Sequence, residues 1–498
     1  MYSLKRNILM RIKKFNQCFH AAALAAIVLA GCVAGPKYEP PVMNIPCEWH
    51  SLLAEGTQTA PIDCFLWWEE LNDPILNALI EKASLQNLDL YMAAERILEA
   101  RAEKKGESLS LYPRLDGSAT YGHVQYSQKT LDRILGLSKE NKNQHRNVNF
   151  FEVGFDAEWE LDLFGKNAHE INALKAKIEA SEEEFCLLWV TLSAEIARNY
   201  IEIRGWQQQL QFIQENIDIQ TEALSLTDGL TKASFTSEVD KKTFEEKLYT
   251  LIAKQPQIEL AINKAIHRLS TLLGYPPGEL FAELYDPLPL PSLPLCKPIG
   301  VPSDLLQRRP DIRKAERELA EATERVGSAV AEMFPRLSLQ GFIGDIQALS
   351  SNSFTWFGGS QLLAPLFNSR LIEQDVEINQ IKAQEALYNY QKTVLGALEE
   401  AENAIASLHY EMERKYWLKQ AKAQSSEAYL LTMQLYQTGF KDYFEVITAK
   451  QSSIQEAEAC LQSDLQLLFN YISLYKALGG GWEIARCSVA DCPNCSAL

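Results

Sequence analysis

Three cysteines near the carboxyl end have the spacing that comes closest to a metal or redox site in this chain. Cys487, Cys492 and Cys495 lie in a short tail after the last helix that the sequence predicts. Thiols so placed could bind a metal ion or form a disulfide, but a zinc site needs a second pair of ligands, and no pair has zinc-site spacing. The seven histidines are scattered, without the HExxH spacing of a metalloprotease. We therefore predict no metal site and no cofactor, and keep a tail disulfide as the alternative.

Catalytic chemistry is not indicated elsewhere in the sequence. It contains no glycine-rich phosphate loop, no metal pair and no recognisable grouping of a nucleophile with a base. We therefore predict no catalytic residues and a protein that is not an enzyme.

The amino terminus has the form of a secretory signal. Five basic residues precede an apolar run from Ala21 to Ala30, which is too short to span a membrane. Leu29-Ala30-Gly31-Cys32 then resembles the bacterial lipobox, whose cysteine is acylated and becomes the first residue of the mature protein. We predict a signal peptide over 1–31, a diacylglycerol and an N-acyl chain on Cys32, and a proline-rich leader over 32–61. The alternative is an ordinary signal with a chance cysteine.

The chain is acidic, with a formal net charge of −17. Removing residues 1–31 takes away five basic and no acidic residues, which makes the charge −22. Because an acidic protein repels a phosphate backbone, we predict no nucleic-acid partner.

The first half of the chain alternates helical patterns with two segments of period two. Apolar residues at helical spacing begin near Asp73-Pro74 and continue to about residue 102, and Pro113 ends this region. Strands are predicted at about 113–126 and 149–163, with a polar loop between them. A long helix with a coiled-coil seam and a return helix follow, over about 167–226 and 237–273.

The second half repeats this order. A helix starts at Pro310, strands are predicted at about 335–349 and 353–367, and a long helix and a return helix cover about 369–437 and 443–478. Two pairs of equivalent residues are each 205 positions apart, which indicates an internal repeat: Asp240 with Glu445, and Gly274 with Gly479. We predict two structural repeats, over 62–290 and 291–482, followed by a cysteine-containing tail over 483–498.

Each predicted strand has one apolar and one polar face, as strands of outer-membrane barrels do. Hydrocarbon tolerates no unpaired sheet edge, and four strands are too few to close a barrel, so several chains would have to share one. The predicted fold is mainly α with a transmembrane β part. The alternative is a soluble pair of β-hairpins on a coiled-coil rod. Whether the acidic face from Asp156 to Asp162 lines a lumen or lies at an interface stays open.

Several motifs together resemble the outer-membrane factors of tripartite efflux systems, in particular the NodT-like and OprM-like lipoprotein branch of the TolC superfamily. Each motif is weak alone, but together they extend over nearly the whole mature chain. They are CVAGPKYEP at 32–40, Trp67-Trp68 with Asp73-Pro74, WELDLFG at 159–165, PSDLL at 302–306 with RPDI at 309–312, and LYKALGGGW at 474–482.

The resemblance implies a homotrimer with a twelve-stranded β-barrel in outer-membrane lipid, continued by a periplasmic α-barrel of long coiled-coil helices. It implies a passive channel, lipid-anchored in the cell outer membrane and extending into the periplasm. Such a channel receives drugs, other toxic compounds or metals from a periplasmic adaptor (membrane-fusion) protein and an inner-membrane RND-type pump. The alternatives are a duct for type I protein secretion and a structural lipoprotein that does not conduct.

In that family, acidic residues and polar links between helix pairs close the periplasmic end, near the turns that follow each long helix. The resemblance puts Asp240 and Glu445 at the two acidic positions, and Tyr436 and Lys441 at the tethering positions. Threefold symmetry would make each acid a ring of three, which attracts cations. The alternative is that both acids are ordinary solvated residues of helix turns.

Three residues depart from the family pattern at these turns. Ser234 stands where glycine is usual, Lys441 replaces an arginine, and Thr448 occupies a position that is often aspartate. Because lysine lacks the forked geometry of arginine, we expect a less firmly closed state.

Overall fold

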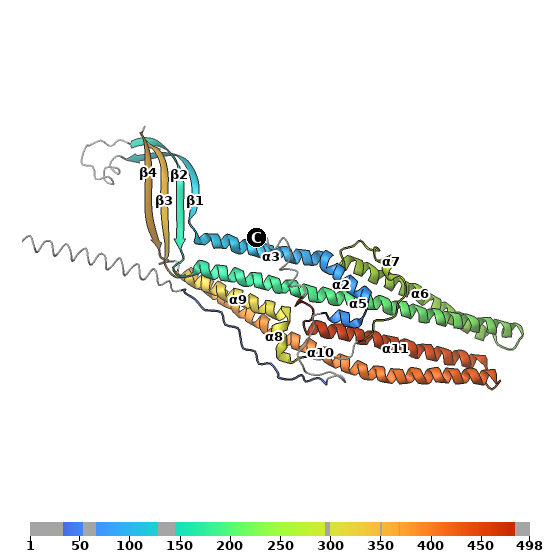
Figure 1. The fold of residues 1–498 in the computed structure, drawn as a ribbon. Coiled ribbons are helices and arrows are strands. Elements are labelled where there is room, and N and C mark those ends of the chain that lie inside the picture. The colour runs from blue at the N-terminus through green and yellow to red at the C-terminus, as the bar shows by residue number, and fades with distance from the viewer. Residues whose placement is uncertain are drawn as a thin grey trace, which may run out of the picture. The chain divides into compact units, whose positions relative to one another are not determined.

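The computed structural model describes residues 33–52, 66–127, 145–293, 299–348, 351–367 and 369–483. These residues are mainly helical, with one four-stranded sheet (Figure 1). The chain divides into two compact units. Unit 1 comprises the described parts of Met1–Pro41, Glu99–Glu179 and Arg317–Tyr388, and unit 2 those of Val42–Leu98, Ala180–Glu316 and Asn389–Leu498.

The order helix, strand, strand, long helix, return helix occurs twice, as α3-β1-β2-α5-α6 and as α9-β3-β4-α10-α11. The elements are η1 (Trp67–Leu71), α2 (Pro74–Gln86), α3 (Leu88–Ser108), η2 (Leu109–Leu111), β1 (Arg114–Ser127), β2 (His145–Leu161), α5 (Lys166–Lys232), α6 (Glu238–Leu272), α7 (Phe281–Leu284), η3 (Pro302–Asp304), α8 (Leu305–Arg308), α9 (Pro310–Ala331), β3 (Arg336–Ala348), β4 (Ser351–Leu363), α10 (Ser369–Gln437) and α11 (Tyr443–Ala477).

The sheet lies in unit 1 and is antiparallel throughout, in the order β1-β2-β3-β4. Directly paired residues point to the same face of an antiparallel sheet. The register therefore puts Phe155, Ile343 and Trp356 on one face, and the side chains of all three are exposed. Asp156 lies on the opposite face, where Phe342 is paired with it. The register therefore agrees with the apolar and acidic faces predicted from the sequence.

Several predicted boundaries were wrong. α5 ends at Lys232 rather than at about 226, and β4 ends at Leu363 rather than at about 367. β2 begins at His145, four residues before the predicted start, so part of the predicted loop is strand; residues 128–144 of that loop lie outside the described residues. The first predicted helix is in fact two, because Asn87 has an extended ψ of 126° and separates α2 from α3. The Asn87 side chain caps α3 by accepting a hydrogen bond from the Leu90 amide (3.0 Å) and donates one to the Leu272 carbonyl (2.7 Å).

The core of unit 2 gathers residues from distant parts of the chain. Trp67 stacks on Tyr475 at a ring distance of 5.9 Å, and the Trp189 indole donates a hydrogen bond to the Gly481 carbonyl (2.7 Å). Arg309 is buried; its guanidinium bonds both carboxylate oxygens of Asp311 and donates to the Ala477 carbonyl. The Arg-Pro-Asp motif thus fastens the start of α9 to the end of α11.

Among the described residues, none of the helices has a stretch both long and apolar enough to cross a membrane.

We predict that Asn87→Ala destabilises the protein by about 1–3 kcal/mol, because it removes a helix cap and leaves the buried Leu272 carbonyl without this donor. The thermal unfolding midpoint of the purified protein in detergent measures the effect. Asn379→Ala is the matched control, because the side-chain hydrogen bond of Asn379, to the Asp375 carbonyl of its own helix, is exposed. Equal midpoints for the two variants would contradict the role assigned to Asn87.

Candidate functional site

The candidate site lies in unit 2, at the two turns that join α5 to α6 and α10 to α11. Both turns have the same construction at residues 205 positions apart. Ser234 and Gly439 are the left-handed residues that end α5 and α10, with φ of 61° and 78°. The next amides, of Phe235 and Phe440, each bond a carbonyl five residues back at 2.9 Å. Such a helix ending favours glycine, so the serine at 234 adopts a strained conformation.

The first turn is stabilised by hydrogen bonds within its own hairpin. Ser237 caps α6 by accepting a hydrogen bond from the Val239 amide (2.9 Å). Asp240 accepts hydrogen bonds from the Ser237 amide (3.2 Å) and the Thr236 hydroxyl (2.8 Å). This is a capping box, so Asp240 keeps the start of α6 in place.

Asp228 near the end of α5 bonds two lysines, one on each side of the turn. The ammonium groups of Lys232 and Lys241 each lie 2.6 Å from its carboxylate. Their hydrogen bonds lower the pKa of Asp228 to about 2, and Asp228 in turn raises the pKa of Lys241. The α5–α6 hairpin is therefore held closed near its tip.

The second turn contains three of the predicted gate residues. Asp442 caps α11 by accepting a hydrogen bond from the Glu445 amide (2.9 Å). The Lys441 ammonium pairs with the Glu445 carboxylate in the same turn. The Tyr436 ring lies 5.3 Å from the ring of Tyr443. The structure therefore brings Lys441 to Glu445, and Tyr436 to Tyr443, whereas the recorded hydrogen bonds of Asp240 stay in the other hairpin.

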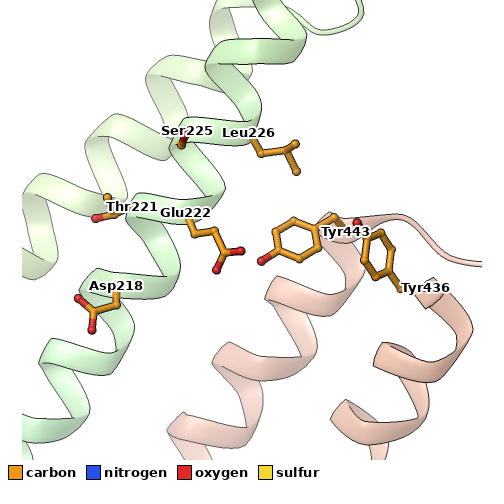
Figure 2. Close-up of a pocket in the computed structure, with 7 residues that line it drawn as sticks. All are labelled: Asp218, Thr221, Glu222, Ser225, Leu226, Tyr436 and Tyr443. Atoms are coloured by element: carbon orange, nitrogen blue, oxygen red, sulfur yellow. The ribbon is translucent and has the colours of Figure 1, made fainter.

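The two hairpins are linked by a contact that the sequence did not reveal. The Tyr443 hydroxyl at the start of α11 faces the carboxylate of Glu222 on α5, and Figure 2 shows the two groups directed at each other. Partial burial and the neighbouring carboxylate of Glu222 raise the pKa of Tyr443 to about 12. We refer to this contact as the Glu222–Tyr443 link.

Further contacts between the hairpins flank this link. Gln451 on α11 donates a hydrogen bond to Gln220 on α5 (2.9 Å), and the rings of Phe244 and Phe444 lie 5.4 Å apart. Beside the link is an open groove of about 600 Å³. Its lining is Asp218, Thr221, Glu222, Ser225, Leu226, Tyr436 and Tyr443. The groove therefore offers carboxylates and tyrosines from α5, α10 and α11.

Glu222 and Tyr443 were missed because neither has a distinctive local pattern. A buried glutamine was the available signal: Gln220 occupies a coiled-coil seam position on α5 and is fully buried. A buried side-chain amide needs a hydrogen-bond partner. The position of Gln220 therefore indicates where along α5 a polar group of another helix must lie.

The predicted cysteine sites lie largely outside the described residues. This holds for Cys32 and for the tail with Cys487, Cys492 and Cys495. Cys47 is exposed, and Cys186 and Cys460 are buried. Within the described ranges no group of histidine, cysteine or acidic residues is arranged to hold a metal ion.

Comparison with known sequences identifies one family. The model of the family described as "Outer membrane efflux protein" matches residues 79–275 and 301–480. Nodulation protein T of Rhizobium leguminosarum bv. trifolii is 27% identical over 466 residues, which cover 92% of this chain and 96% of that protein. Pyoverdine export outer membrane protein OpmQ of Pseudomonas aeruginosa is 27% identical over 472 residues, covering 94% and 97%.

Comparison with solved structures agrees. The outer-membrane channel OprN superposes with a TM-score of 0.81 at 31% sequence identity, over 91% of this chain and all of that one. The predicted family, the outer-membrane location and the prediction of a channel rather than an enzyme are therefore confirmed.

We predict that Tyr443→Phe weakens the contact between the hairpins, lowering the unfolding free energy by about 1 kcal/mol at pH 8. Above pH 10 a tyrosine in the unfolded chain loses its proton, whereas folded Tyr443 keeps it until about pH 12. Deprotonation therefore favours the unfolded state of the wild type, and the difference between wild type and variant shrinks from pH 10 to pH 12. Thermal midpoints measured across this range give the result.

Tyr249→Phe serves as the control, because Tyr249 is an exposed tyrosine on α6. A difference between wild type and Tyr443→Phe that stays constant from pH 8 to pH 12 would count against the Glu222–Tyr443 link.

Proposed function

The chain belongs to the outer membrane efflux protein family, and from this premise we propose that it is the outer-membrane channel of a tripartite efflux system. A periplasmic adaptor and an inner-membrane RND-type pump deliver the substrate and supply the energy, and the channel conducts passively. The named relatives include a pyoverdine export protein, and solvent and toluene efflux proteins, which favours small molecules as substrates.

The observation that carries the proposal is the four-stranded sheet. Among the described strands, β1 and β4 each pair on one side only, so the sheet has two open edges. The exposed face carries large apolar side chains, including Tyr121, Phe155 and Trp356. A lipid-facing sheet must close, and three copies of four strands give a barrel of twelve. The chain then assembles as a homotrimer, with the acidic face of the strands toward the lumen.

The long helices continue the barrel into the periplasm as a tunnel, and the turns of the candidate site form its gate. Three copies turn Asp240 and Glu445 into two rings of three carboxylates, which favour cations at the aperture. Lys441 neutralises part of the Glu445 ring, because it pairs with this residue in its own chain. The link from Glu222 to Tyr443 holds the α10–α11 hairpin against α5 in the closed state.

The remaining parts of the chain keep the roles predicted from the sequence. Residues 1–31 are removed as a signal peptide, Cys32 carries the lipid, and 32–61 form the leader. Two repeats over 62–290 and 291–482 supply the strands and helices, and 483–498 form the tail.

Two other functions are alternatives that experiment can distinguish from this one. A type I secretion duct would pass an unfolded protein, and a structural lipoprotein would form an oligomer without conducting. The efflux relatives support small-molecule export over both.

We predict that the purified protein has the mass of three acylated chains. Native mass spectrometry in detergent measures the complex, and the mass of the denatured chain reports the acylation. Cys32→Ser is expected to abolish the acyl mass and to leave the trimer intact. A monomer would refute the shared barrel, and an unmodified wild-type chain would refute the lipid anchor without affecting the barrel.

We predict that the double variant Asp240→Ala, Glu445→Ala conducts more current than wild type in a planar bilayer and loses the cation preference. Because alanine at 240 also removes the capping box of α6, Asp240→Asn with Glu445→Gln is measured beside it, which removes the charges and keeps hydrogen-bond acceptors. The same loss of cation preference is expected in this second variant. Unchanged selectivity in both would remove the two acids from the gate.

A further inference from the structure

The first described residues of the chain are held by hydrogen bonds to their backbone. The Ala34 amide donates to the Phe164 carbonyl (2.9 Å), and the Ala34 carbonyl lies 3.0 Å from Nε2 of His169. His169 is at the start of α5, four residues after Gly165, and all of these residues belong to unit 1. A leader attached only by side chains could slide along the surface, whereas bonds to its backbone fix its register.

Glycines allow the leader to come this close. At Gly35, φ is 125° and an added Cβ would lie 2.7 Å from the Cα of Gly327 on α9. At Gly327 an added Cβ would lie 2.5 Å from the ring of His169. Any side chain at either position would push the leader or the imidazole out of place. The site is therefore shaped for backbone, with the imidazole lying over the helix at Gly327.

The chemistry of His169 fixes its protons. The Ala34 carbonyl can only accept a hydrogen bond, so Nε2 carries a proton. The other ring nitrogen, Nδ1, lies 2.6 Å from a carboxylate oxygen of Glu324 on α9, so one more proton is shared between these two atoms. Only 5% of the His169 side chain and 16% of the Glu324 side chain are exposed. A hydrogen bond of this kind is stronger out of water than on the surface.

We propose that His169, Glu324 and Gly327 form a docking site for Ala34 in the chain's own processed amino terminus, and that this site positions the lipid anchor. The proposal rests on the proposed acylation of Cys32. His169 and Glu324 are positioning residues, which hold Ala34 near the end of β2. Two peptide units separate Ala34 from the acylated cysteine, a reach of at most about 8 Å. The proposed acyl chains are therefore attached within this reach of Ala34.

Cleavage by trypsin after Lys37 tests the docking, because Lys37 is an exposed residue of the same leader and a protease needs the surrounding backbone to detach. The full-length acylated protein is digested in detergent, and the rate at Lys37 is compared with the rate at Lys175 on α5. His169→Ala and Glu324→Ala are expected to raise the Lys37 rate at least tenfold, with the Lys175 rate unchanged. Glu321→Ala is the matched control, since Glu321 lies one turn earlier on α9 and pairs with Arg325.

A variant in the leader itself tests the proposal even if the helix variants fail to fold. Ala34→Pro removes the amide that donates to Phe164 and alters no helix, so it is expected to give the same increase at Lys37. Rates at Lys37 within twofold of wild type in Ala34→Pro, and in whichever helix variant folds, would overturn the proposal. The mass of the released 32–37 fragment reports acylation separately, so a missing lipid would refute the proposed anchor while leaving the docking result in force.

Discussion

The rest of the structure depends on one constraint, which is that the backbone amides and carbonyls along the two edges of the four-stranded sheet need hydrogen-bond partners. A backbone amide that faces hydrocarbon without a partner costs several kcal/mol, so β1 and β4 cannot remain edges in a membrane. Within one chain, the described strands leave both of these edges open. In the proposed trimer every copy presents the same two edges, so β1 of one copy can pair with β4 of the next.

Much of the fold could be predicted because its boundaries are set locally. Pro310 and Pro335 mark the start of α9 and its end before β3, and alternation along β2 fixes which residues share a face. The break at Asn87 could not be predicted, because the residue that makes it favourable is Leu272, 185 positions away. A single asparagine in an apolar helical pattern is compatible with a continuous helix until that partner is known.

The contacts of the candidate site likewise divide into local ones, which the sequence predicts, and long-range ones, which it does not. The caps of α6 and α11 involve residues within three positions of each other, and the repeat of 205 residues revealed both acids. The Glu222–Tyr443 link joins helices more than two hundred residues apart, and neither residue has a local pattern that marks it. Lys441 illustrates the converse. The family pattern predicts that this residue tethers one helix pair to another. In this chain it forms an ion pair with Glu445, one turn away.

Contacts within a hairpin and contacts between hairpins have different consequences for the proposed gate. Contacts within a hairpin, such as the helix caps and the pairing of Asp228 with Lys232 and Lys241, must persist for the hairpin to move as a unit. In the proposed gate, contacts between hairpins must break. Near the turns, those described here are two polar contacts, Tyr443 with Glu222 and Gln451 with Gln220, and one apolar contact between the rings of Phe244 and Phe444. Each such polar contact contributes about 1 kcal/mol, an amount that the binding of the proposed adaptor can exceed.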